Sequence, residues 1–275
     1  MTVRAWFIVC VFPGLVFAGP WASSKVWDDG KAEVSVYQAQ WKRYGRTYPG
    51  RYLTVLVKEP WAPDLNVKAD HARPDGFDVL KLNVLRDVPT GIYTYHQTVS
   101  TYLRRADLSM VKLAATSSEA CGISTADASN GKLRTRSYFD GEGDRVADWP
   151  EGALPEDALS VRLRSYVAGK PPREIRVVPS FLANRYEDLV PRAYTLARAV
   201  PKKIEVPAGS FEAVRFDLRA PGRLRSYWIE RAFPHRWVRY EQEDGTTYVL
   251  AKSERLAYWK MHDPGDEAWL PSGLK

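Results

Sequence analysis

The chain has 275 residues and a formal net charge of +7. Its residues are 45% hydrophobic and 27% charged, which is ordinary for a globular protein. No block of five or more Lys and Arg residues occurs, so the composition does not favour nucleic-acid binding. The modest basic excess is also compatible with contact to an anionic membrane face or a polyanion.

Residues 1–18 have the organisation of a secretory signal peptide. Arg4 is followed by a short apolar segment, and Val16 and Ala18 precede Gly19 at the spacing of a cleavage site. The apolar segment is shorter than the about 20 residues that a spanning helix needs, and no later segment has that character. We therefore expect a periplasmic or otherwise exported protein without a transmembrane segment. The alternatives are lipidation at Cys10 and a buried N-terminal strand.

The chain contains two cysteines, Cys10 and Cys121. If Cys10 leaves with the signal peptide, Cys121 has no partner for an internal disulfide. Removal of residues 1–18 also removes Arg4, which lowers the net charge to +6. In an oxidising compartment, burial or a partner would then have to protect the Cys121 thiol.

Alternation of apolar and polar residues predicts β-strands along most of the chain. The clearest case is the segment from Val214 to Arg219, in which every second residue is apolar. The other predicted strands cover residues 32–41, 52–58, 79–85, 92–102, 110–115, 133–139, 173–178, 224–230, 237–241 and 247–250. Turns are predicted between them, for example at Tyr48-Pro49-Gly50. The pattern predicts a mainly β fold of antiparallel hairpins, forming an open barrel or a two-lobed sheet.

One or two short helices are expected within this β fold. Leu154-Pro155-Glu156-Asp157 begins the clearer helix, with Pro and acidic residues in the first turn, and Gly169 ends it. A weaker candidate covers residues 181–189, and residues 60–76 are predicted to form a long loop. We expect residues 19–275 to form a single domain. The helix near residues 155–167 is a candidate lid, and residues 150–170 are a candidate seam between two β-lobes.

Several local motifs together resemble a family of uncharacterised exported proteins of Gram-negative bacteria. These motifs are Leu80-Lys81-Leu82-Asn83, Thr90-Gly91-Ile92-Tyr93-Thr94-Tyr95, Ser118-Glu119-Ala120-Cys121-Gly122, Ser137-Tyr138-Phe139-Asp140-Gly141-Glu142-Gly143-Asp144, Val206-Pro207-Ala208-Gly209-Ser210-Phe211 and Tyr227-Trp228-Ile229-Glu230. The resemblance spans nearly all of residues 19–275 and implies a β-rich domain of unknown function. In the family pattern an aromatic residue precedes the cysteine, whereas this chain has Ala120 there.

The expected architecture also resembles the half-barrels of the outer-membrane lipoprotein carriers. Those proteins bind lipid chains on a concave apolar face. The likeness concerns architecture alone, because one fold can serve many functions.

Candidate catalytic residues are Cys121 and Glu119, since a thiolate with an acid and a histidine can carry out acyl transfer. His96 is the histidine of the predicted hairpin formed by residues 92–102 and 110–121. Pairing in that hairpin places position 96 near position 115, some 20 Å from Cys121 at about 3.3 Å per residue. Direct contact between the two is therefore not expected, and the competing interpretation is a small buried thiol near a strand end.

The segment Asp140-Gly141-Glu142-Gly143-Asp144 is a candidate metal site. Its carboxylates Asp140, Glu142 and Asp144 are the hard oxygen ligands that Ca²⁺ prefers. The segment lacks the length and the distant bidentate acid of an EF-hand loop. The competing interpretation, which we favour, is a hairpin tip with solvated acids. The four histidines are not spaced as a paired metal site would be, and no cofactor is expected.

Arginines and aromatic residues supply the remaining candidates. The arginines are Arg215, Arg219, Arg223, Arg225, Arg236 and Arg239. They are expected to pair across strands with acids such as Glu230 and Glu241, or to form a polyanion site. The aromatic candidates for ligand binding are Tyr93, Tyr95, Tyr138 and Trp228. The tryptophans at positions 41, 61, 149, 228, 237 and 259 are expected either to line a sugar- or lipid-binding groove or to fill the core.

Three functions remain open on the sequence alone. The favoured one is a non-enzymatic exported protein that binds a lipid, a glycan or an envelope protein. Its basis is the exported β-rich pattern together with the absence of familiar catalytic motifs. The alternatives are an envelope enzyme built on Cys121 and a structural component of an envelope assembly.

Overall fold

The computed structural model describes residues 19–186 and 189–272, and the predicted signal peptide lies outside these residues. Within them the chain forms one large sheet of seventeen strands. The strands are β1 Ala32–Arg43, β2 Arg46–Ala62, β3 Val67–Lys68, β4 Phe77–Thr90, β5 Tyr93–Arg104, β6 Met110–Glu119, β7 Gly122–Ser129, β8 Lys132–Arg136, β9 Arg145–Asp148, β10 Leu154–Pro155, β11 Glu174–Val178, β12 Arg192–Arg198, β13 Lys202–Val206, β14 Gly209–Ala220, β15 Arg223–Glu230, β16 Trp237–Gln242 and β17 Thr247–Leu256.

Helices are short in the described part of the chain. The α-helices are α1 Pro20–Ser23 and α2 Leu159–Arg162, and the 3-10 helices are Lys25–Asp28, Glu156–Ala158, Leu163–Tyr166, Tyr258–Lys260 and Asp266–Trp269. None of these helices is long and apolar enough to cross a membrane. The predicted helix after Leu154 is confirmed as the sequence of turns from Glu156 to Tyr166, which we call the inner helical segment.

The strands pair mainly with their neighbours in the chain. From one edge to the other the order is β9, β8, β7, β6, β5, β4, β2, β1, β17, β16, β15, β14, β12, β11 and β10. All of these pairings except β10 with β11 are antiparallel. Short β3 pairs with the end of β2, and β13 pairs with the first part of β14. The first strand thus pairs with the last one, while β9 and β10 end an open sheet.

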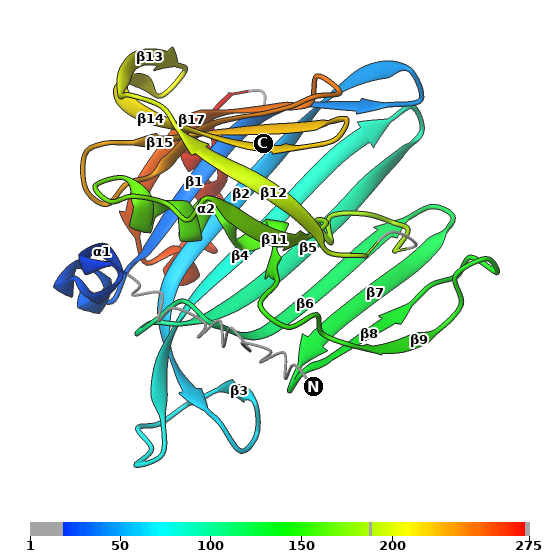
Figure 1. The fold of residues 1–275 in the computed structure, drawn as a ribbon, viewed down its shortest axis with the longest axis horizontal. Helices are drawn as coiled ribbons and strands as arrows, with labels where there is room; N and C mark the ends of the chain where they lie inside the picture. Colours follow the sequence, from blue (N-terminus) through cyan, green and yellow to red (C-terminus); the bar gives the residue numbers. More distant parts are fainter. Residues whose placement is uncertain (1–18, 187–188, 273–275) are drawn as a thin grey trace, which may run out of the picture.

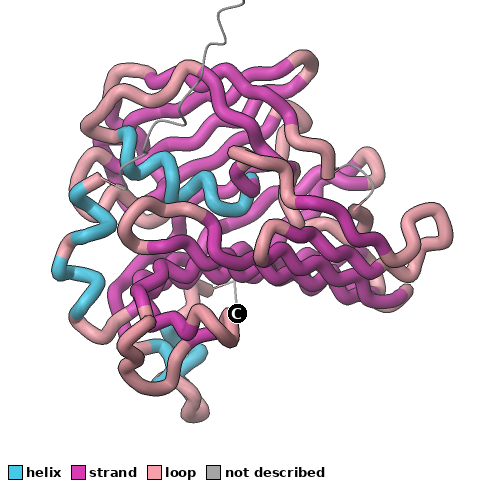
Figure 2. Tube along the Cα trace, turned by 60° about the horizontal axis from the view of Figure 1, so that its bottom comes forward, coloured by secondary structure: helices cyan, strands magenta, loops and turns pink. Residues whose placement is uncertain are grey.

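The sheet bends into an open half-barrel. Register shifts opposite Val36/Tyr37, Tyr102/Leu103 and Trp228/Ile229 mark β-bulges in β17, β6 and β16, and a β-bulge bends its strand and increases the twist. Figure 1 shows β11, β12 and α2 crossing in front of β2, β4 and β5. Figure 2 shows the strands turning from one layer into a second at a steep angle. This confirms the predicted mainly β fold with an open arrangement and short helices.

The main core lies on the concave side of the half-barrel. Buried residues of the inner helical segment, among them Leu159, Val161 and Leu163, belong to one apolar cluster with inward-facing strand residues such as Val99 and Phe216. The predicted alternation explains the strand contribution, because every second residue faces inward. A smaller cluster on β1 and β2 includes Val34 and Val55, and Trp269 from the C-terminal part packs against it.

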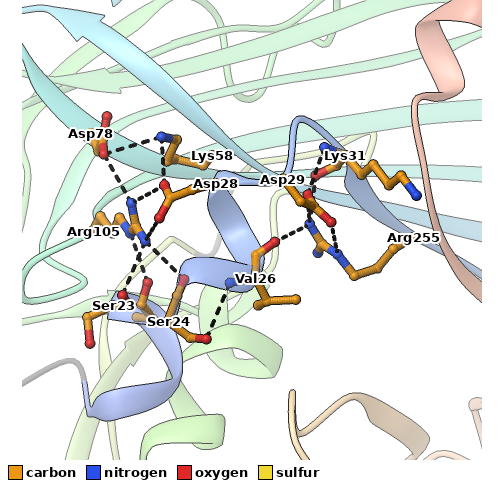
Figure 3. A network of polar contacts seen from close by, with 11 residues as sticks. Ser23, Ser24, Val26, Asp28, Asp29, Lys31, Lys58, Asp78, Arg105 and Arg255 are labelled. Atoms are coloured by element: carbon orange, nitrogen blue, oxygen red, sulfur yellow. Dashed lines mark hydrogen bonds and ion pairs between the residues drawn. The ribbon is translucent and has the colours of Figure 1, made fainter.

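The segment that precedes β1 is tied to the sheet by two arginines (Figure 3). Arg105, between β5 and β6, donates hydrogen bonds to the carbonyl oxygens of Ala22, Ser23 and Ser24 and pairs with Asp28 at 2.8 Å. Arg255 of β17 pairs with Asp29 at 2.7 Å. These backbone carbonyls lie outside the sheet and accept hydrogen bonds from charged arginine side chains. The hydrogen bonds hold the segment in place.

The predicted turn at Tyr48-Pro49-Gly50 and the predicted loop over residues 60–76 are corrected. The β1–β2 turn lies at Tyr44-Gly45, and Pro49 is inside β2, opposite Gln40. Pairing of β2 with β4 begins only at Arg51, so β2 has a single neighbour at Pro49 and its missing N–H is tolerated. Strand β2 continues to Ala62 and pairs with β3, so residues 60–76 contain a short antiparallel pair.

The predicted second helix at residues 181–189 is wrong in its described part. Residues 181–186 contain no helix, and residues 187–188 lie outside the described residues. Carboxylates distant in the sequence bind backbone N–H groups here, including that of Tyr186, which a helix would direct to the carbonyl of residue 182. The Phe181 N–H donates to Asp157 Oδ2 at 2.8 Å, and the Tyr186 N–H donates to Glu142 Oε2 at 2.8 Å. Side-chain acceptors of this kind compete with helix formation.

Candidate functional site

A cavity of about 260 Å³ opens on the concave side of the half-barrel. Strands β1, β2, β4, β15, β16 and β17 form its floor, and the inner helical segment and residues 179–183 border it. Its lining contains six aromatic residues: Trp41, Tyr52, Tyr227, Trp237, Tyr240 and Tyr248. The lining also contains charged and polar side chains, and a concave site that combines aromatic walls with convergent polar groups is typical of small-ligand binding.

Cross-strand register builds the aromatic wall. Tyr227 lies opposite Tyr240, and Tyr240 lies opposite Tyr248, so three tyrosines from adjacent strands form one row. The ring centroids of Tyr227 and Tyr240 are 4.8 Å apart, and those of Tyr240 and Tyr248 are 5.3 Å apart. Tyr52 extends the row, with its centroid 4.5 Å from that of Tyr248. Paired aromatics of this kind stabilise the sheet and present a continuous surface to the cavity.

A buried ion pair borders the cavity. Arg225 of β15 donates from Nε to Oε1 of Glu156, which begins the inner helical segment. The two side chains are 7% and 8% exposed. Tyr240 also places its hydroxyl 3.3 Å from Glu156 Oε1. The pair joins the sheet to the inner helical segment, because each charge would be costly to bury alone.

Arg86 of β4 is a second buried arginine on the cavity wall. It donates from Nε to Gln97 Oε1 at 2.8 Å, from Nη1 to the Tyr248 hydroxyl at 3.1 Å, and from Nη2 to the Leu182 carbonyl. Its guanidinium carbon lies 4.7 Å from the ring centroid of Trp41. The acceptors and the ring together compensate the buried charge.

Asp157 is the remaining buried acid of the cavity. Its Oδ1 accepts a hydrogen bond from the Ser180 hydroxyl at 2.6 Å, and its Oδ2 accepts the Phe181 N–H. Burial is the main cause that raises the pKa of Asp157 to about 6. The group is therefore mostly ionised at neutral pH and takes up a proton in mildly acidic solution.

The cavity residues Arg86, Glu156 and Asp157 were not predicted as site residues, and Arg225 was a candidate only as a member of an arginine face. The alternation did contain a signal for the two arginines. Position 86 continues a buried series with Leu82 and Val84, and position 225 shares its face with Tyr227. A charged residue at an inward position of a strand indicates an interior polar site.

Cys121 and Glu119 lie together, but at an exposed turn rather than in the cavity. Glu119 accepts the Cys121 N–H at 2.8 Å and the Tyr138 hydroxyl at 2.7 Å. The thiol is exposed, which corrects the expected buried cysteine. The hydrogen bond from the thiol to the Glu119 carboxylate, followed by the charge of that carboxylate, raises the pKa of Cys121. The geometry thus disfavours the thiolate that a nucleophile needs.

The predicted register of the β5–β6 hairpin is also corrected. His96 lies opposite Ser118 rather than position 115, because the loop and the bulge opposite Tyr102/Leu103 shift the pairing. The His96 ring is hydrogen-bonded to Asp87 at 2.8 Å. Asp87 and not Cys121 is therefore the side-chain partner of His96.

The aromatic candidates Tyr93, Tyr95 and Tyr138 lie near the same end of the sheet as Cys121. Tyr95 is buried, with its hydroxyl 2.8 Å from that of Tyr44, and it contacts Tyr93 and Trp41. Tyr93 and Tyr95 do not line the cavity, whereas Trp41, which contacts Tyr95, does. Their role in ligand binding stays a prediction.

Trp228, Arg215, Arg219 and Arg239 lie on the opposite face of β14–β16 from the cavity, whereas Arg223 shares the inward face of β15 with Arg225. Trp228 is buried between the guanidinium groups of Arg215 and Arg239, at 5.9 and 5.3 Å. The other contacts are ion pairs of Arg215 and Arg219 with Asp217, Arg223 with Glu243, Arg236 with Glu230 and Arg239 with Glu241. The expected acids Glu230 and Glu241 thus do pair with arginines, while Arg225 pairs with Glu156 at the cavity.

The acidic segment at residues 140–144 lies in the connection of β8 to β9 and is a hairpin tip, but the expectation that all its acids are solvated is wrong for Glu142. Glu142 is buried and binds the Tyr186 N–H and, at 3.5 Å, Arg185. Asp140 and Asp144 are exposed. Among residues 19–186 and 189–272, no group of three or more His, Cys, Asp or Glu side chains is arranged to hold a metal ion.

The six tryptophans divide between the core and other places. Trp61, Trp228 and Trp237 are buried, whereas Trp259 is 46% exposed and Trp149 is partly buried. Only Trp41 and Trp237 of the six also line the cavity. Core packing is thus shown for the buried tryptophans, while a sugar- or lipid-binding role for Trp41 and Trp237 stays a prediction.

No known protein family and no curated protein matches the chain. It is similar to a solved structure described as a β-barrel-like protein of domain of unknown function DUF1849 from Brucella abortus. The two sequences are 10% identical, the TM-score is 0.49, and the likeness covers 82% of this chain and 98% of that chain. The neighbour, like the family that the sequence resembles, is a β-rich protein of a domain of unknown function.

Proposed function

We propose that the protein is exported to the cell envelope and binds a small ligand in the half-barrel cavity without converting it. The observation that carries this proposal is the cavity itself, an aromatic wall combined with buried polar groups from β4, β15 and the inner helical segment. Buried polar groups lower the stability of a fold unless each has a hydrogen-bond partner. Proteins retain such groups mainly at functional sites, such as binding sites. The signal-like residues 1–18 support the exported location.

The position of Cys121 weighs against the enzymatic alternative. The thiol lies in an exposed turn, and its raised pKa leaves little thiolate at neutral pH. Its hydrogen-bonding neighbour Glu119 is a carboxylate with a lowered pKa, so it is a weak base toward a thiol whose own pKa is raised. The histidine of the same hairpin, which would be the stronger base, is hydrogen-bonded to Asp87 instead.

The test has two arms. Fractionation of cells that express the full chain should place a protein lacking residues 1–18 outside the cytoplasm, whereas a full-length cytoplasmic product would contradict export. Purified residues 19–275 should gain thermal stability with a member of a panel of saccharides, fatty acids and short peptides. The gain should vanish in Ser160→Phe, which places a ring at the cavity wall, and persist in the exposed control Ser210→Phe. No stabilisation by any class would overturn ligand binding.

A further inference from the structure

We propose that the ligand of the cavity is a neutral polyhydroxylated molecule, a saccharide of one or two rings, rather than a lipid chain or an anion. This inference rests on the proposed binding function and names its ligand class. Its basis is that the charged groups of the cavity already have protein partners, whereas three hydroxyl groups on the cavity wall do not.

The charged groups of the cavity are already engaged with protein partners. Arg225 is paired with Glu156 and also places Nη1 3.6 Å from Glu243. Asp157 accepts one hydrogen bond on each oxygen. An anionic or cationic ligand would have to break one of these buried interactions, which costs the full desolvation of the group left behind.

The other two arginines of the cavity are likewise occupied. Arg86 directs its guanidinium to Gln97, the Leu182 carbonyl and the Tyr248 hydroxyl. Arg43 donates to Asn184 at 3.2 Å, and its guanidinium carbon lies 5.2 Å from the ring centroid of Trp41. The Arg43 Nε has no partner among the described residues, but it is closed off from the cavity. Neither arginine therefore offers the open donor fork that carboxylate or phosphate recognition uses.

Three hydroxyl groups on the cavity wall are open instead. Tyr52, Tyr227 and Ser160 line the cavity, and within residues 19–186 and 189–272 none of their hydroxyls has a hydrogen-bond partner. A hydroxyl both donates and accepts, so it matches the hydroxyls of a sugar and leaves an acyl chain unrecognised. Burial also raises the pKa values of Tyr52 and Tyr227 well above their usual value, which keeps both phenols neutral.

The aromatic row supplies the complementary apolar surface. The rings of Tyr52, Tyr248, Tyr240 and Tyr227 follow one another at centroid distances of 4.5, 5.3 and 4.8 Å. The interplanar angles of 30° for Tyr52–Tyr248 and 15° for Tyr240–Tyr248 place these ring faces against one another, so the row meets the cavity with ring edges, an apolar carbon surface against which the C–H groups of a sugar ring can pack. A saccharide therefore satisfies the rings and the hydroxyls together.

The same lining opposes a lipid chain. Methylene groups in the cavity would remove water from Glu156, Asp157 and Arg225 without replacing its hydrogen bonds. The cavity of about 260 Å³ is also small beside the range of roughly 300–1,000 Å³ common for drug-sized ligands. A compact polar ligand fits both its size and its polarity.

The test is calorimetric titration of residues 19–275 with neutral sugars, namely glucose, galactose, N-acetylglucosamine and lactose, beside glucuronate and decanoate. At least one neutral sugar should bind with 1:1 stoichiometry and change the tryptophan fluorescence, because Trp41 and Trp237 line the cavity. Tyr52→Phe and Tyr227→Phe should each weaken that binding about tenfold, since each removes one hydrogen bond. Tyr258→Phe, a 36% exposed control outside the cavity, should leave it unchanged.

The outcomes separate the ligand class from the proposed function. If glucuronate or decanoate alone binds and Ser160→Phe abolishes that binding, the ligand class is wrong and the cavity is still a binding site. If no probe binds, both proposals fail. Sugar binding that both Tyr→Phe variants leave unchanged would overturn the inference, because the site would lie elsewhere. Thermal melting of each variant separates lost binding from lost folding.

Discussion

The guanidinium group of Arg225 and the carboxylate of Glu156 form an ion pair in the interior of the half-barrel, where both side chains are more than nine-tenths buried. Arg225 belongs to β15, and Glu156 begins the inner helical segment. The contact therefore fixes that segment against the sheet at the wall of the cavity. It also leaves both charges of the pair engaged with each other rather than open to a ligand, which is a premise of the proposed neutral ligand.

Removal of one partner of this pair should be strongly destabilising. Arg225→Met or Glu156→Gln leaves the other charge buried and unpaired, at an expected cost of about 3–5 kcal/mol. The double variant should cost less than the sum of the two. Urea unfolding of residues 19–275 measures all three. The exposed pair Arg231 and Glu212 is the control, and its removal should cost at most about 1 kcal/mol. Strict additivity of the two buried changes would contradict the pairing.

Asp157 should make the protein more stable in mildly acidic solution than at neutral pH. Its pKa is about 6 in the folded state against 3.8 when unperturbed, so the folded state binds its proton more tightly. The contribution is full below about pH 4 and is lost as pH rises through 6, with a size of roughly 2–4 kcal/mol.

Asp157→Asn should remove this part of the pH dependence, which urea unfolding at pH 4.5, 5.5, 6.5 and 7.5 can follow. The matched change Asp148→Asn affects a side chain that is 81% exposed and should leave the profile as it is. A profile unchanged in Asp157→Asn would show that the carboxyl titrates normally.

Arg105→Ala should release the segment before β1. The change removes the donors to three carbonyls and the ion pair with Asp28, at an expected cost of about 2–3 kcal/mol. Hydrogen exchange of residues 20–28 should rise more than exchange of the strands. Arg73→Ala, which breaks surface pairs with Asp64 and Asp75, is the control. Unchanged protection of the segment would show that its apolar contacts suffice.

The contact between Arg105 and Asp28 should also make the stability of this segment depend on pH. The side-chain hydrogen bond from Arg105, and then that from Lys58, lowers the pKa of Asp28 below its usual range. A depressed carboxyl pKa stabilises the fold above its unfolded value near 4, and this stabilisation is lost as pH falls. The protection of residues 20–28 against hydrogen exchange should therefore decrease below pH 4 in the unmodified chain and change less in Arg105→Ala.

Glu119→Gln should make Cys121 more reactive. The carboxylate raises the pKa of the thiol by accepting its hydrogen bond and by its charge, so the neutral amide should lower that pKa. Iodoacetamide alkylation of residues 19–275, in which Cys121 is the only cysteine, should then reach half of its maximal rate at a lower pH. Asp148→Asn serves as a charge control. An unchanged midpoint would place the thiol away from Glu119.

The residue pattern predicted most of the strands and the faces they present. Val214, Phe216 and Leu218 alternate in the sequence, and all three are buried. The turns after Leu154 were also predictable from Pro155 and the acids that follow it. These features are local, because a strand face follows from a period of two and a helix start from a few neighbouring residues.

Register and the second helix were not predictable in the same way. His96 lies opposite Ser118 because a longer loop and a bulge together shift the β5–β6 pairing, and neither is visible in the alternation of the two strands. Residues 181–186 are irregular because Asp157 and Glu142, both distant in sequence, accept their N–H groups. Both features depend on contacts with other segments of the chain, which the local alternation of apolar and polar residues does not specify.

The sequence by itself determined that the fold is mainly β and which residues of many strands face inward. It also indicated arginine–acid pairs across the strands and contains the signal-like residues 1–18. Only the tertiary structure decided that β1 pairs with β17 and that Arg86, Glu156, Asp157 and Arg225 meet around one cavity. The physical reason is that alternation specifies which side of a strand is buried. Which distant strand or turn that side meets is decided by the curvature of the whole sheet.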